Sequence, residues 1–207
     1  MSLFPRALAP IFIVMLCVVA PAGALAASPT GGTAFEVEPP PPEMLAPGLW
    51  SGPEVPGTEA VLRANGTAAA PADAPEQVKQ AIWAANSLQA LPYRYGGGHN
   101  LQFDVAAGAD CSGTISFALR AAGLLKAPLD SGSFMRWGEQ GRGDWITVFT
   151  NPGHAYIVIA GLRLDTSMAG MSRTAKRVSR TAFERGPRWR PMSRSARGFV
   201  KRHARSF

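Results

Sequence analysis

The stretch "GADCSGTISFALRAAGLL", residues 108–125, predicts a helix that begins at a cysteine. Asp110 is of a type favoured at the N-cap, which gives Cys111 the first helical position. Apolar residues recur at 115, 118, 119 and 122, the spacing of one buried helix face. Cys111, four residues before Ile115, lies at the N-terminal end of that face. A helix N-terminus favours the thiolate, so Cys111 is either a nucleophile or a small core residue.

The N-terminus has the pattern of a secretory signal peptide. Arg6 precedes the apolar run "LAPIFIVMLCVVA" (8–20), and the small residues "ALA" follow at 24–26. We predict that residues 1–26 are this signal and that the protein is secreted to the cell envelope. The alternative is an uncleaved membrane anchor, for which the run is short. Cleavage would leave Cys111 as the only cysteine, and a lone thiol in an oxidising compartment indicates a reactive group or an intermolecular link.

The rest of the chain divides into a predicted tether and a predicted domain. Residues 27–75 are rich in Pro, Ala and Gly and predict a disordered tether. Residues 76–207 predict the domain, with a first helix in "PEQVKQAIWAANSLQ" (75–89) and an edge strand at 197–204. Three strands are predicted between them, at "GDWITVF" (143–149), "HAYIVIA" (154–160) and "LRLDTS" (162–167). This order predicts an α+β fold with helices packed on an antiparallel sheet.

The net charge of +7 is concentrated at the C-terminal end. From Arg173 onward there are 12 of the 21 Lys and Arg residues and one acidic residue, Glu184. In an exported protein, an anionic envelope polymer is a more accessible partner for this end than nucleic acid. The alternative is a solvated basic surface with no specific partner. No Cys–His cluster has metal-ligand spacing and no phosphate-binding loop is present, so we expect neither metal nor cofactor.

His154 is the predicted base for Cys111, because it begins a strand directly after the turn "NPG". A two-residue turn at Ala160–Gly161 would place Tyr156 opposite Asp165, with His154, Tyr156 and Asp165 on one face of the sheet. Asp165 would then orient His154. A different turn length would move Asp165 to the other face, and its alternative role is to cap the following turn. His99 is interpreted as a loop residue.

Three segments together resemble the NlpC-type cell-wall cysteine peptidases, which are papain-like enzymes that cleave the peptide stems of bacterial peptidoglycan. They are "PYRYGGG" (92–98), "DCSG" opening a helix at 110–113, and "GHAYIVIAG" (153–161). The resemblance covers roughly residues 76–207. It implies a papain-like fold and a Cys111–His154 pair with a polar third residue.

The resemblance also implies a substrate site. It suggests that Tyr93 contributes its hydroxyl near the sulfur, and that Tyr93, Asp110 and Ser112 recognise the free amino end of a stem peptide. Many family members have tyrosine at the position of Ala109 and histidine at the position of Asp165.

The sequence therefore predicts an exported cysteine peptidase that hydrolyses an amide bond in peptidoglycan stem peptides. Two alternatives stay open. One is a cell-wall amidase, and the other is a catalytically inert envelope-binding protein anchored by the basic end.

Overall fold

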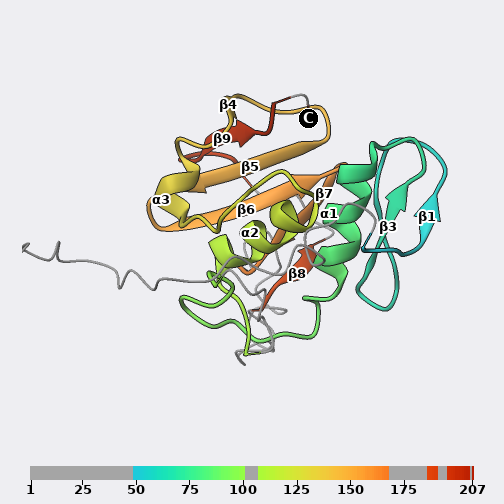
Figure 1. Ribbon diagram of the computed structural model, residues 1–207, viewed down its shortest axis with the longest axis horizontal. Coiled ribbons are helices and arrows are strands. Elements are labelled where there is room, and N and C mark those ends of the chain that lie inside the picture. The colour runs from blue at the N-terminus through green and yellow to red at the C-terminus, as the bar shows by residue number, and fades with distance from the viewer. Residues whose placement is uncertain (1–48, 101–106, 168–185, 191–194, 206) are drawn as a thin grey trace, which may run out of the picture. The chain divides into compact units, whose positions relative to one another are not determined.

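The computed structural model describes residues 49–100, 107–167, 186–190, 195–205 and 207 (Figure 1). All of them belong to one compact unit that spans residues 36–207. The predicted signal peptide at 1–26 lies outside the described residues. Among the residues that are described, no helix is long and apolar enough to cross a membrane.

Two helices pack against each other and cover one face of the larger sheet (Figure 1). They are α1 (Glu76–Asn86) and α2 (Cys111–Ala121). Both predicted helices are thus confirmed, and the apolar face expected for the cysteine helix is buried in the main core. A short third helix, α3 (Ser131–Phe134), contacts the sheet separately. Because α2 packs directly on the strand that begins at His154, the helix and strand carrying the two predicted catalytic groups are neighbours.

The larger sheet has six antiparallel strands in the order β4-β9-β5-β6-β7-β8. Their bounds are β4 Glu139–Gln140, β5 Ile146–Asn151, β6 His154–Ile159, β7 Leu162–Asp165, β8 Arg188–Arg190 and β9 Val200–His203. Helices on an antiparallel sheet confirm the α+β class and the three predicted central strands. The prediction that 197–204 forms an edge strand is wrong. β9 pairs with β5 on one side and with the two-residue strand β4 on the other, so β4 is the edge strand.

The hairpin between β6 and β7 has the predicted register. Ile159 pairs with Leu162, which leaves Ala160 and Gly161 as a two-residue turn. Their φ angles of 46° and 83° are both positive, as a type I′ turn requires. Two pairs further from the turn, Ile157 pairs with Leu164, which places Asp165 across from Tyr156 and diagonal to His154. The turn length therefore brings Asp165 to the side of the sheet where His154 lies.

The tether prediction is wrong for residues 49–75, while residues 27–48 lie outside the described part of the chain. A second, three-stranded sheet lies here, in the order β1-β3-β2. Its strands are β1 Glu54–Val55, β2 Val61–Leu62 and β3 Ala68–Pro71. β3 is buried against α1, and the Asn86 side chain on α1 bonds both the N–H and the carbonyl of Ala68, at 2.7 and 2.9 Å. Alanine side chains let the strand pack closely on the helix, which produces burial without the long apolar pattern expected of a core strand.

Candidate active site

Asp110 caps α2 and fixes the position of Cys111. Its backbone is extended, and its carboxylate oxygen Oδ1 accepts a hydrogen bond from the Gly113 N–H at 2.7 Å. The Thr114 hydroxyl closes the first turn by donating to the Asp110 carbonyl at 2.6 Å. Cys111 is the first residue of the helix, as predicted, and its side chain is half-buried. The N–H groups of a first turn have no partner within the helix, so the thiol lies in a field that favours a negative charge.

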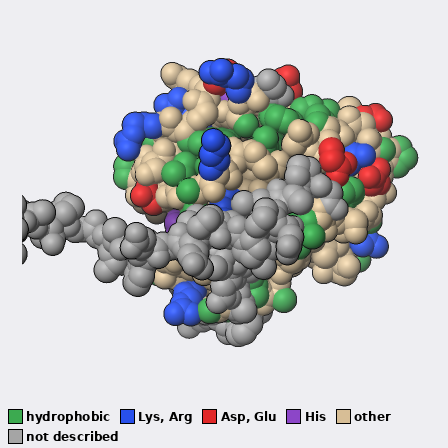
Figure 2. Space-filling model, viewed as in Figure 1, with side chains coloured by type: hydrophobic (Ala, Val, Ile, Leu, Met, Phe, Trp, Pro, Cys, Tyr) green, Lys and Arg blue, Asp and Glu red, His purple; other side chains and the backbone are tan. Residues whose placement is uncertain are grey.

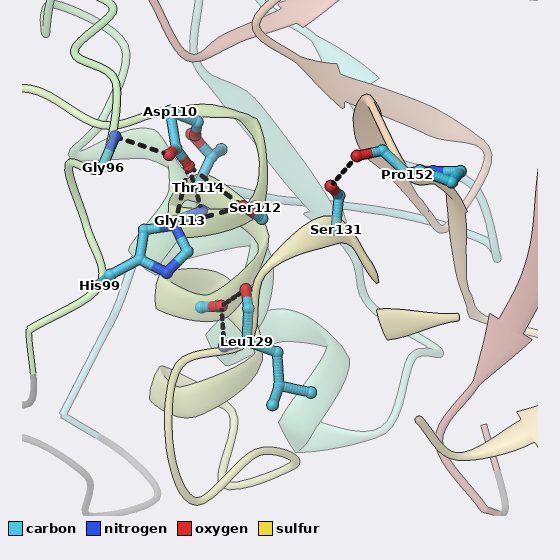
Figure 3. Close-up of polar contacts among 10 residues, drawn as sticks. Gly96, His99, Asp110, Ser112, Gly113, Thr114, Leu129, Ser131 and Pro152 are labelled. Carbon is cyan, nitrogen blue, oxygen red and sulfur yellow. Dashed lines mark hydrogen bonds and ion pairs between the residues drawn. The ribbon is translucent and has the colours of Figure 1, made fainter. Parts of the chain in front are cut away.

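A glycine-rich loop packs directly on this first turn, as Figure 3 shows for Gly96, His99 and Asp110. The Asp110 N–H donates to the Gly97 carbonyl at 3.1 Å, and the Gly96 N–H donates to Asp110 Oδ2 at 2.9 Å. A Cβ on Gly113 would overlap the Gly97 carbonyl oxygen and would come within 3.0 Å of the Gly98 Cα. Gly98 and Gly113 are therefore required by the close approach of the loop and the helix backbones.

His154 and Asp165 form the second half of the site. His154 Nε2 lies 2.9 Å from Asp165 Oδ1, and the Asp165 side chain is fully buried. Asp165 also caps the turn that follows it, because it accepts bonds from the Ser167 N–H at 2.8 Å and the Ser167 hydroxyl at 3.0 Å. The two roles considered for Asp165 are thus compatible. Arg163 Nε lies 3.7 Å from Asp165 Oδ2 and adds a positive charge beside the carboxylate.

Cys111 belongs to the same arrangement, because its interaction with His154 contributes to the raised pKa of the imidazole. Because Nε2 faces Asp165, Nδ1 is the ring nitrogen left for the sulfur. Burial disfavours the imidazolium, but hydrogen bonds to Asp165 and Cys111 outweigh it and raise the pKa of His154 to about 9. At neutral pH the ring is therefore protonated next to the thiol, the condition for a thiolate–imidazolium pair.

The residues implied for substrate recognition lie around the same helix end. Tyr93 forms an isolated parallel bridge with Ala109, next to the N-cap. Burial, with the nearby negative charges of Cys111 and Asp110, raises the pKa of Tyr93, which therefore stays protonated as a hydrogen-bond donor. Asp110 and Ser112 are 6% and 4% exposed, so both lie largely beneath the surface.

His99, interpreted from the sequence as a loop residue, belongs to this cluster. Its Nε2 lies 3.0 Å from Asp110 Oδ1 and 3.2 Å from the Ser112 hydroxyl (Figure 3). The signal for this placement is the glycine run before it, because a loop of glycines can approach a helix closely enough to bring the next side chain to the helix end. No three His, Cys, Asp or Glu side chains within the described residues are grouped as metal ligands.

Comparisons of the chain with protein-family models, with curated proteins and with solved structures find no significant match.

Proposed function

We propose that this chain is an exported papain-like cysteine peptidase that hydrolyses an amide bond in peptidoglycan stem peptides. The observation that carries the proposal is the alignment of three groups. The Cys111 thiol lies at a helix N-terminus and helps to raise the pKa of His154, and His154 Nε2 lies 2.9 Å from the buried Asp165 carboxylate. A nucleophile, a base and an orienting acceptor in this order are the groups that acyl transfer through a thiol requires.

In the proposed reaction, the Cys111 thiolate attacks the carbonyl carbon of the scissile amide. The oxyanion that forms lies at the N-terminus of α2, where the Cys111 N–H stabilises the charge. The His154 imidazolium gives its proton to the departing amine, and the acyl group remains on sulfur as a thioester. His154, now neutral, accepts a proton from water as the water attacks the thioester, which releases the carboxylate and restores the pair.

The choice of peptidoglycan as substrate is supported by the motifs rather than by the triad alone. The segments "PYRYGGG" and "DCSG", which carry the resemblance to NlpC-type peptidases, are the two that pack together around Asp110. The basic end offers weaker support for an anionic partner. On the face in Figure 2, the Lys and Arg side chains of the described residues are dispersed rather than gathered in one patch.

The test is to incubate the purified protein with purified muropeptides and to identify the products by mass spectrometry. We expect new fragments from the parent and none from Cys111→Ala. Cys17→Ala is the matched control, because it removes the only other cysteine and should leave the products unchanged. Cleavage between two amino acids defines an endopeptidase, and release of the whole stem from the glycan defines an amidase.

An inert envelope-binding protein gives a different result. It would sediment with cell-wall material in a salt-sensitive manner, and its Cys111 would react with iodoacetamide no faster at neutral pH than an ordinary thiol. Equal fragment yields from the parent and Cys111→Ala would contradict the peptidase.

A further inference from the structure

Two buried arginines lie next to Asp165 on neighbouring strands. Arg163 on β7 and Arg190 on β8 are cross-strand partners, and they are 3% and 8% exposed. Arg163 Nε lies 3.7 Å from Asp165 Oδ2, and Arg190 Nε donates to the Asp165 carbonyl at 3.3 Å. Like charges directly opposite each other destabilise a sheet, and apolar residues fill buried positions without the cost of desolvating a charge. The two arginines therefore point to a role at Asp165 beyond packing.

The position of the Asp165 carboxylate is set by Ser167. The Ser167 N–H donates to Oδ1 at 2.8 Å, and the Ser167 hydroxyl donates to Oδ2 at 3.0 Å. Both donors are neutral and lie two residues along the chain. At 3.7 Å, the contact of Arg163 Nε with the carboxylate is an ion pair and is too long for a hydrogen bond. The contribution of Arg163 to this carboxylate is therefore positive charge.

Several charged or titratable groups share the side of the sheet on which His154 and Asp165 lie. The register places there Tyr156 on β6, Arg163 on β7, Arg188 and Arg190 on β8, and Lys201 on β9, while α2 contributes Cys111 and the loop before β5 contributes Arg142. Burial and the charges of Arg163 and Arg188 lower the pKa of Arg190 to about 10, despite the attraction of Asp165. The arginines thus stay charged at neutral pH, and Arg163 is the one that directs Nε at a carboxylate oxygen of Asp165.

The two carboxylate oxygens of Asp165 face different cations. Oδ1 lies 2.9 Å from His154 Nε2, and Oδ2 lies 3.7 Å from Arg163 Nε. A carboxylate whose charge is partly balanced by one cation stabilises a second cation less, and the two cations also repel each other. Arg163 therefore weakens the stabilisation that Asp165 gives to the His154 imidazolium.

This weakening matters for the transfer of a proton. A general acid works best when its pKa is near the working pH, because a proton that is held too tightly is given up slowly. Asp165 and Cys111 raise the pKa of His154 to about 9. In the proposed reaction this imidazolium gives its proton to the departing amine, so a charge that opposes the two contributions assists that step.

We propose that Arg163 is a positioning residue of the active site, and that it acts through Asp165 to make the His154 imidazolium release its proton more readily. This inference rests on the proposed function and deepens it, because it assigns a residue to the control of proton transfer. The buried Arg163 side chain acts from beneath the surface, without contact with the substrate.

The experiment replaces Arg163 in three ways and follows the imidazole of His154 by NMR titration of the full chain. Arg163→Gln and Arg163→Met remove the charge, and Met also keeps an apolar stem. Arg163→Lys retains a charge. Arg202→Gln is the matched control, because Arg202 lies on β9 of the same sheet and donates to the Met135 carbonyl at 2.7 Å. Stability in urea and the cleavage of muropeptides across the pH range are measured for each variant.

We expect both neutral variants to raise the pKa of His154 by about 0.5–1 pH unit, a part of the shift of about 1–3 units that a charge exerts on its direct partner. The alkaline limb of cleavage should move upward by the same amount. Cleavage at neutral pH should fall by about 2- to 3-fold, because the imidazolium becomes a weaker acid. Arg163→Lys and Arg202→Gln should titrate as the parent does.

A role confined to folding would lower the free energy of unfolding and leave the pKa of His154 in place. A pKa that is unchanged or lower in the neutral variants would therefore overturn the inference, as would an equal rise in Arg163→Lys or Arg202→Gln. Failure of both neutral variants to fold would assign Arg163 to the scaffold and would also overturn it.

The titration separates this inference from the proposed function, because it requires no turnover. If the parent cuts no muropeptide, the peptidase is refuted. A raised pKa of His154 in the neutral variants would still support the coupling of Arg163 to His154 through Asp165.

Discussion

Replacing Asp165 with asparagine tests the electrostatic design of the site directly. The change removes the charge of the carboxylate and nearly preserves its shape. In the parent, the pKa of His154 stands at about 9 instead of 6.5, which corresponds to about 3 kcal/mol in favour of the imidazolium. A hydrogen bond to a charged group contributes about 1.5–3 kcal/mol of this, or about 1–2 pH units. We therefore expect Asp165→Asn to bring the pKa of His154 down to about 7–8.

The measurement is an NMR titration of an untagged chain. The sequence has three histidines, so the three imidazole Hε1 signals can be assigned with one variant each. Asp144→Asn is the matched control, because Asp144 is an exposed acid in the loop before β5. A His154 signal that titrates within about half a pH unit of the parent in Asp165→Asn would refute the assignment of Asp165 as the orienting group.

The raised pKa of His154 decides how Asp165→Asn should change reactivity and stability as the pH rises. The imidazolium persists up to about pH 9 in the parent, so the alkaline limb of the proposed peptidase activity should fall near that pH and move to about 7–8 in Asp165→Asn. The stabilisation by His154 is fully present below its unfolded pKa and is lost as the pH rises through about 9. Asp165→Asn should therefore lower the free energy of unfolding more at pH 6 than at pH 9.5, as measured in urea.

Three further substitutions test the scaffold by urea unfolding. Gly113→Ala should lower the free energy of unfolding by about 1–3 kcal/mol, because its Cβ would overlap the Gly97 carbonyl, and no loss would contradict the close loop–helix packing. Asn86→Ala should lower the free energy of unfolding by about 3 kcal/mol, because it removes two hydrogen bonds to the β3 backbone and one at 2.8 Å from the Trp189 indole. A loss below about 1 kcal/mol would show that β3 packs on α1 without these bonds. Gly161→Ala should lower the free energy of unfolding by about 1 kcal/mol, because φ is positive at this position. A Cβ there would meet only Glu59 at 3.9 Å, so no clash adds to this loss, and a neutral result would contradict the type I′ turn.

The parts of the site that could be predicted from the sequence are set by local rules. An N-cap aspartate places Cys111 at the first helical position whatever the helix packs on. A two-residue turn sets the register between β6 and β7, and with it the face on which Asp165 lies. Both features depend on residues a few positions apart, so a single sequence was enough to predict them.

The parts that could not be predicted depend on contacts between distant segments. β3 is held by the Asn86 side chain and by close packing of its alanines, and neither leaves an apolar period in the sequence. The position of β9 inside the sheet is set by β4, a strand of two residues that is too short for any alternation to be detected. His99 reaches Asp110 only because Gly97, Gly98 and Gly113 permit two backbones to touch.

Two histidine–aspartate pairs thus lie beside Cys111, and they differ in what else the histidine contacts. In the pair of His154 with Asp165, Nε2 faces the carboxylate and Cys111 helps to raise the pKa of the ring, so we expect this pair to control a proton. In the pair of His99 with Asp110, the imidazole Nε2 contacts the N-cap carboxylate at 3.0 Å, so the pair joins the glycine-rich loop to the start of α2. Loss of the first pair should therefore change the pH dependence of the Cys111 reaction, and loss of the second should weaken the attachment of the glycine-rich loop to α2. Variants that moved both properties together would show that the two pairs are not independent.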